Sequence, residues 1–172
     1  MGRRSFTVGL AIAAACLLVT PAGSGVANSP YNSVTGSGKL MVPYPPGEFT
    51  PEQFDVSAHD GPHGPHGTIV FHSPLSADNP ARADVTCLVV DGNMAKVGGF
   101  FREPFLYNGE LISAFGIIIV DNGSPGSGQP DTVHPVVFLE RLHPKPPNRP
   151  CNIDWPPLAV EQGNYVVSAA SP

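Results

Sequence analysis

The sequence has few charged residues and no cluster of basic ones. It carries 9 Lys and Arg against 14 Asp and Glu among 172 residues, so its net charge is −5 with neutral histidines. An acidic balance without a basic cluster argues against nucleic acid and anionic membrane surfaces as partners. The chain also has no G-x-S-x-G motif, so a serine nucleophile of that type is not indicated.

The first apolar run is too short to cross a bilayer as a mature helix. It covers 12 residues, from Val8 to Val19, whereas a transmembrane helix needs about 20. Arg3 and Arg4 precede the run and small residues follow it, which is the pattern of a secretory signal peptide. We therefore predict cleavage near Ala27, with residues 1–27 removed and residues 28–172 forming one secreted domain. The arginine pair is similar to a twin-arginine signal, so export after folding stays open.

Long stretches free of proline and glycine are also missing. With 21 prolines and 19 glycines, long helices have almost nowhere to form, and short apolar runs lie between turn residues instead. This pattern predicts an all-β fold, either a single antiparallel β-sandwich or a small β-barrel. About eight short strands are expected, at residues 33–42, 53–59, 67–72, 83–91, 93–101, 111–121, 133–142 and 163–169.

The predicted strands differ in their environment. Ile69 and Phe71 alternate with more polar neighbours, which is typical of a strand with one face on the core. Residues 111–121 are apolar on both faces, so this strand should be central and covered. Pro135 lacks the N–H that a strand ladder needs, so that part of its strand should lie at an edge or at the start of the strand. The proline-rich residues 144–157 are expected to form an extended connection.

Only two cysteines remain after cleavage of the signal peptide, Cys87 and Cys151. In an oxidising compartment an even pair favours a disulfide. Closing a loop of about 65 residues stabilises a fold by roughly 4 kcal/mol in the chain-entropy model. A reactive thiol would need a base and an electropositive setting, whereas Cys87 falls inside an apolar strand. We therefore predict a Cys87–Cys151 disulfide.

A β-hairpin is indicated at Asp91-Gly92-Asn93, because Gly and Asn tolerate the positive φ of tight turns. Its register has two alternatives. A three-residue loop groups one set of side chains on a single face: Cys87, Val89, Ala95 and Val97. A two-residue turn at Gly92-Asn93 groups another set: Leu88, Val90, Ala95 and Val97. The pair Gly98-Gly99 is a point where the strand can bulge or bend.

Several turn and strand motifs are spread over most of the mature chain, and the hairpin is the most specific of them. These segments are Thr35-Gly36-Ser37-Gly38, Phe54-Asp55-Val56-Ser57-Ala58-His59, Gly64-Pro65-His66-Gly67, Val85-Thr86-Cys87-Leu88, Gly92-Asn93-Met94-Ala95-Lys96-Val97-Gly98-Gly99 and Val120-Asp121-Asn122-Gly123-Ser124-Pro125-Gly126. Together they resemble a family of small secreted proteins that is common in actinobacteria and generally of unknown function. The resemblance implies a second cysteine after the Asp-Asn-Gly loop, which Cys151 matches, and it implies no catalytic residues.

The residues most able to carry chemistry are histidines between 59 and 66. His59, His63 and His66 could gather around Zn²⁺ or Cu²⁺, which favour neutral imidazole nitrogen. The Gly-Pro pairs between them place these histidines on an extended or turning loop, so an ordinary solvated turn is the alternative. No other cofactor is indicated.

The sequence therefore predicts a secreted, non-catalytic β module with a binding or structural role at the cell envelope or outside the cell. Its partner would be an extracellular or envelope ligand, with no nucleic acid and no membrane span in the mature chain. Two alternatives stay open: an enzyme acting on an extracellular polymer, and a metal-binding protein that uses the loop between His59 and His66.

Overall fold

The structure is a computed structural model that describes residues 30–43, 46–75, 80–107, 109–124, 128–139, 151 and 158–171. The predicted signal segment 1–27 and its cleavage site near Ala27 lie outside these residues. The same holds for most of the proline-rich connection 144–157, of which Cys151 is described.

The nine elements of the described residues are all strands. They are β1 (Ser33–Val42), β2 (Thr50–His59), β3 (His66–His72), β4 (Ala81–Asp91), β5 (Met94–Tyr107), β6 (Glu110–Val120), β7 (Thr132–Leu139), β8 (Leu158–Ala159) and β9 (Gln162–Ser168). They form one sheet in the order β8-β7-β6-β5-β4-β3-β2-β1-β9, with antiparallel pairing between all neighbours. The predicted all-β fold is confirmed, with β8 as a short strand that the sequence did not predict.

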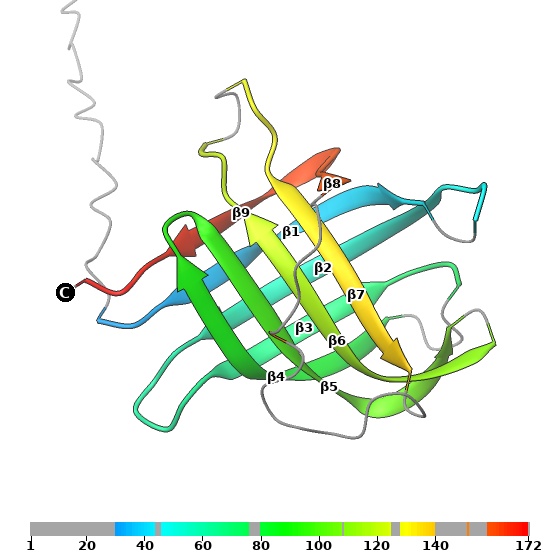
Figure 1. The fold of residues 1–172 in the computed structure, drawn as a ribbon, viewed down its shortest axis with the longest axis horizontal. Helices are drawn as coiled ribbons and strands as arrows, with labels where there is room; N and C mark the ends of the chain where they lie inside the picture. Colours follow the sequence, from blue (N-terminus) through cyan, green and yellow to red (C-terminus); the bar gives the residue numbers. More distant parts are fainter. Residues whose placement is uncertain are drawn as a thin grey trace, which may run out of the picture.

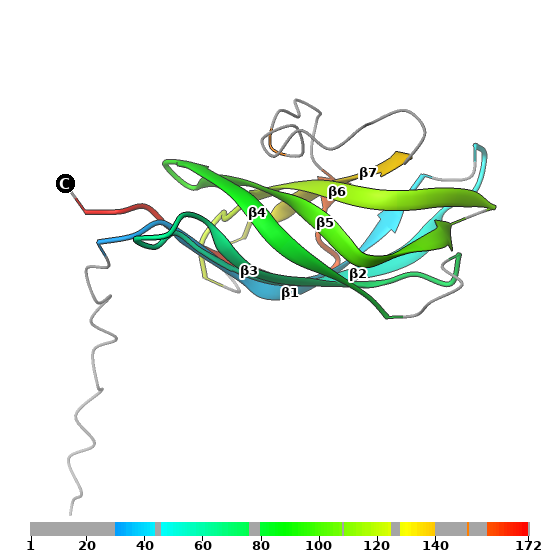
Figure 2. The ribbon, with the colours of Figure 1, turned by 90° about the horizontal axis from the view of Figure 1, so that it is seen from below.

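The sheet curls into a half-barrel (Figure 1). Viewed from the side, β1–β3 lie beneath β4–β7 (Figure 2), and the main apolar cluster fills the inside of the curl. Its largest fully buried members include Phe71, Ile117 and Tyr165. The edge strands β8 and β9 are consecutive in the chain, and the turn between them contacts both ends of the sheet. Val160 N–H donates to the carbonyl of Asp131, the residue before β7, and Glu161 N–H donates to the carbonyl of Lys39 on β1.

The environments predicted for three strands are confirmed. Ile69 and Phe71 of β3 are each 1% exposed. Strand β6 is central and buried on both faces from Ile112 to Ile119. Strand β8 pairs only with Thr132 and Val133 of β7. Pro135 therefore lies on a part of the outer edge of β7 that no described strand pairs with, where its missing N–H is tolerated.

The hairpin between β4 and β5 has the two-residue turn at Gly92-Asn93. Asp91 pairs with Met94, and Gly92 adopts the left-handed φ of 59°. This register turns Leu88 and Val97 toward the core. The sequence predicted a bulge at Gly98-Gly99 on β5, which is the wrong strand. The irregularity in this pair lies on β4, between Val85 and Cys87. Both glycines stay in register, and a Cβ on Gly99 would collide with the carbonyl oxygen of Asp84.

The predicted disulfide between Cys87 and Cys151 is present, with a Cα–Cα distance of 6.1 Å. Cys87 pairs with Gly98 of β5, which in turn pairs with Gly116 of β6. Because side chains alternate along a strand, this row faces away from Leu88 and Val97, on the outside of the curl. Two residues without side chains therefore leave room beside Cys87 for the sulfur bridge.

The segment Thr35-Gly36-Ser37-Gly38 has a structural explanation in Tyr165. A Cβ on Gly36 or Gly38 would lie within 3.0 Å of the Tyr165 ring, so the two glycines make room for this ring across β1. The Tyr165 hydroxyl then reaches β2 and donates to the Phe54 carbonyl at 2.9 Å. Burial, and next the negative charges of Asp55 and Asp131, raise the pKa of Tyr165 above its ordinary value, so the hydroxyl stays a donor.

Candidate functional site

The outer face of β1, β2 and β3 carries mostly polar side chains. On each strand the alternate residues that point inward are buried and apolar for the most part, and those that point outward are exposed or half-buried. The register places the outward residues side by side. They include Thr35, Ser37 and Lys39 on β1, Gln53, Asp55, Ser57 and His59 on β2, and His66, Thr68, Val70 and His72 on β3. We refer to this set as the polar face.

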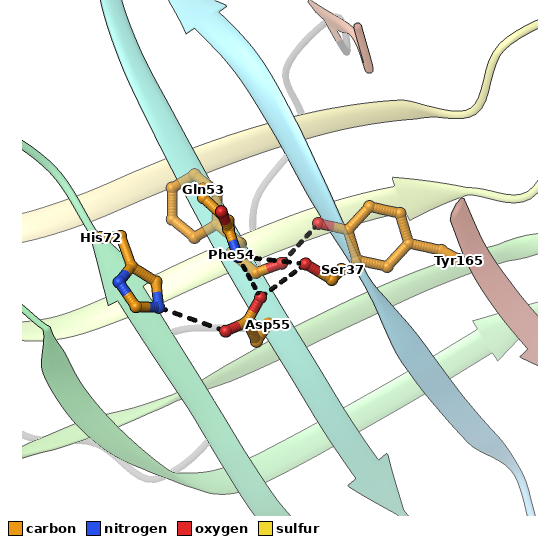
Figure 3. Close-up of polar contacts among 6 residues, drawn as sticks. All are labelled: Ser37, Gln53, Phe54, Asp55, His72 and Tyr165. Atoms are coloured by element: carbon orange, nitrogen blue, oxygen red, sulfur yellow. Dashed lines mark hydrogen bonds and ion pairs between the residues drawn. The ribbon is translucent and has the colours of Figure 1, made fainter. Parts of the chain in front are cut away.

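Asp55 is the centre of a hydrogen-bonded cluster on the polar face (Figure 3). Its Oδ1 accepts from Ser37 Oγ at 2.6 Å and from Gln53 Nε2 at 2.8 Å. Its Oδ2 lies 3.2 Å from His72 Nε2. Gln53 Nε2 also lies 3.3 Å from Ser37 Oγ. The Asp55 cluster thus joins β1, β2 and β3 through one carboxylate.

Asp55 remains ionised at neutral pH. Partial burial raises its pKa, but hydrogen bonds from Ser37, Gln53 and His72, together with the charge of His72, outweigh that effect and hold the pKa of Asp55 below its ordinary value. The side chains of His72 and Asp55 are 36% and 39% exposed. A negative acceptor with neighbouring donors is therefore presented to solvent in a fixed arrangement.

The order of groups in the Asp55 cluster differs from that of a serine nucleophile. In a Ser-His-Asp relay the imidazole lies between the hydroxyl and the carboxylate. Here Asp55 lies between Ser37 and His72, so the imidazole contacts the carboxylate and not the hydroxyl. The arrangement suits recognition of a ligand that both donates and accepts hydrogen bonds, and it places a carboxylate, not an imidazole, beside the Ser37 hydroxyl.

The histidines predicted as metal ligands fall at one end of the polar face. His59 and His66 occupy directly opposed positions on β2 and β3, and their ring centroids are 6.1 Å apart. His63 is exposed in the connecting turn. Among the described residues, no group of three or more His, Cys, Asp or Glu side chains is close enough to hold a metal ion. The structure therefore brings together two of the three residues.

The loop between β6 and β7 uses its carboxylates for the fold. Asp131 Oδ1 accepts from Asn122 N–H at 2.9 Å, and its Oδ2 accepts from Tyr165 N–H on β9. Asp121 accepts from Gly123 N–H and from Val167 N–H. A hollow of about 300 Å³ lies beside this loop and the start of β9. Because both carboxylates already bind backbone donors, this hollow offers no free acid from either of them.

Sequence reasoning missed the members of the Asp55 cluster. Gln53 is only two residues before Asp55 on β2, but Ser37 and His72 lie on other strands, and only the strand register places them beside Asp55. One signal was available: polar residues alternate with apolar ones from Gln53 to His59, which is typical of a strand with one face in solvent.

Comparison with known proteins finds no matching family model, no similar curated protein and no similar solved structure. The resemblance to small secreted actinobacterial proteins therefore stays a prediction. Within the described ranges, no helix is long and apolar enough to cross a membrane.

Proposed function

We propose that this protein is a secreted, non-catalytic binding module that recognises a polar ligand of the cell envelope or extracellular space through its polar face. The observation that carries the proposal is the Asp55 cluster, in which a half-exposed carboxylate is held by three side chains from three strands. Fixed donors and acceptors bind a ligand with a smaller loss of conformational entropy than mobile ones do.

The chemistry of the polar face favours a ligand rich in hydroxyl groups. Asp55 supplies a charged acceptor, Gln53 and His72 supply planar groups beside it, and Lys39 lies opposite Gln53 in the register. Hydroxyl groups both donate and accept, so they can replace water at each of these positions. An extracellular polysaccharide has this chemistry.

The proposal is tested by retention on isolated envelopes of the producing cell. Wild type is compared with Asp55→Asn, which removes the charge and keeps the shape, and with Asp91→Asn, a matched control in the exposed β4–β5 turn. Loss of one charged hydrogen bond corresponds to about 2 kcal/mol or roughly a thirtyfold weaker retention. We expect this loss for Asp55→Asn, with an unchanged Tm at neutral pH within a few degrees, and none for Asp91→Asn.

Two results would contradict the proposal. One is wild-type protein that is not retained on the envelopes at all. The other is equal retention of Asp55→Asn and Asp91→Asn, which would exclude the Asp55 cluster as the contact. Release of soluble fragments from the envelopes by wild type would instead support the alternative of an enzyme acting on an extracellular polymer.

A further inference from the structure

His59 and His66 form a cross-strand pair that the Asp55 cluster does not use. They are the last paired residues of β2 and β3 before the connecting loop, and both side chains lie on the outer face. Within the loop, Gly64 N–H donates to the Gly61 carbonyl and closes a turn, and Asp60 N–H donates to the carbonyl of Asn32, the residue before β1. The backbone under both histidines is therefore fixed by the sheet on one side and by this closed turn on the other.

The hydrogen bonds of the two rings leave one nitrogen of each available. His66 Nδ1 lies 3.3 Å from the Gly64 carbonyl oxygen, which can only accept, so Nδ1 carries the proton and Nε2 keeps its lone pair in the neutral ring. His59 Nε2 lies 3.2 Å from the Ser57 hydroxyl, and within the described part of the chain His59 Nδ1 has no hydrogen-bond partner. A ring N–H donated to a backbone carbonyl is the support that metal-binding histidines commonly have.

The spacing of the rings suits one shared ion. With a metal–nitrogen distance of about 2.0–2.1 Å, an imidazole centroid lies about 3.2 Å from its metal, so two rings on one ion have centroids at most roughly 6.4 Å apart. The observed separation is 6.1 Å. His66 is exposed and His59 is half-buried. Rotation of the His66 ring can therefore narrow the nitrogen–metal–nitrogen angle without moving the core.

We propose that His59 and His66 form a two-imidazole site for a late divalent transition metal, copper(II) before nickel(II) or zinc(II). Imidazole suits all three ions, and copper(II) binds such ligands most tightly in the series. The remaining coordination positions face solvent, where water or a ligand atom fills them. This site is separate from the Asp55 cluster and does not depend on the function proposed for it.

Titration of the oxidised protein, prepared without a polyhistidine tag, with copper(II) in calorimetry tests the site. We expect one ion per chain, with affinity at least about tenfold weaker in His59→Ala and in His66→Ala, a loss worth about 1.4 kcal/mol. His63→Ala and His72→Ala are the matched controls and should keep the wild-type affinity. Electron paramagnetic resonance of the bound copper should show two imidazole nitrogens in wild type and one in either single variant.

Folding is checked separately, since each variant should keep the metal-free Tm of wild type. His66→Gln offers a second test because it keeps a polar side chain of similar size, and it should lose affinity as His66→Ala does. The proposal is overturned if His63→Ala weakens binding as much as His59→Ala, since the loop would then supply the ligands. It is also overturned if both His59→Ala and His66→Ala bind copper as wild type does.

Discussion

Asp131 should be among the most sensitive positions of this fold when changed to Asn. The side chain is 5% exposed, and its carboxylate accepts from the backbone N–H groups of Asn122 and Tyr165. Tyr165 lies on β9, an edge strand whose N–H groups on the side away from β1 face no neighbouring strand among the described residues. Asp131→Asn keeps the shape but turns one acceptor oxygen into a donor NH₂ that faces an N–H group.

The expected loss follows from these two hydrogen bonds. A hydrogen bond to a charged group contributes about 1.5–3 kcal/mol, and a buried donor left unpaired costs about 1–3 kcal/mol. Asn122 is half-buried, so water can replace part of its bond, whereas Tyr165 is fully buried. We expect Asp131→Asn to lower the free energy of unfolding by about 3 kcal/mol, which corresponds to roughly 9 °C in Tm for a domain of this length.

Urea unfolding of the oxidised protein, followed by far-ultraviolet circular dichroism, measures this loss. Asp91→Asn makes the same chemical change in an exposed turn and should stay within about 0.5 kcal/mol of wild type. Amide hydrogen exchange locates the effect: the Tyr165 N–H should exchange faster in Asp131→Asn, while the Val167 N–H, which donates to Asp121, should change less. If Asp131→Asn were as stable as the Asp91→Asn control, the inference that the Asp131 carboxylate stabilises β9 by accepting from Tyr165 N–H would be refuted.

Three further outcomes are expected. Tyr165→Phe should cost about 1–2 kcal/mol in urea unfolding, because the Phe54 carbonyl loses its donor. Reduction of Cys87–Cys151 should cost about 4 kcal/mol for its separation of 64 residues, measured by unfolding with and without reductant. Wild type should be more stable than Asp55→Asn by under about 1 kcal/mol above pH 5, and this advantage should shrink as pH falls from about 4 through the lower pKa of folded Asp55. The sign follows from the lowered pKa of Asp55 in the folded state, and acid-range unfolding curves check it.

Most strands could be predicted because each carries its own local signal. The alternation of apolar residues in β3 is a pattern within one strand, and so are the apolar residues on both faces of β6. The predicted bounds of β1 agree with the observed Ser33–Val42. Strand β8 could not be predicted, because two residues are too few to show a period. The bulge was placed on the wrong strand because glycines permit a bulge, whereas here Gly99 accommodates the close backbone of β4.

The candidate sites could be predicted only where they are local. His59 and His66 lie on one hairpin, so their proximity follows from a short loop. The Asp55 cluster needs Ser37 and His72, each brought in from another strand by register. The sequence could not decide between the two registers of the β4–β5 hairpin, because each of them places apolar side chains together on one face. The structure decides it with Thr86 as the extra residue, which sends Cys87 outward and Leu88 inward.

The position of β9 beside β1 governs the order in which this protein can assemble. Tyr165 and its acceptor on β2 are 111 residues apart, and β1 keeps an open edge until β9 arrives. Pairing over such a separation is slow, because much chain entropy is lost before any contact forms. During that interval the open edge of β1 is a template for another chain. Completion of the sheet by its last strand therefore limits how long the nascent protein is exposed to aggregation.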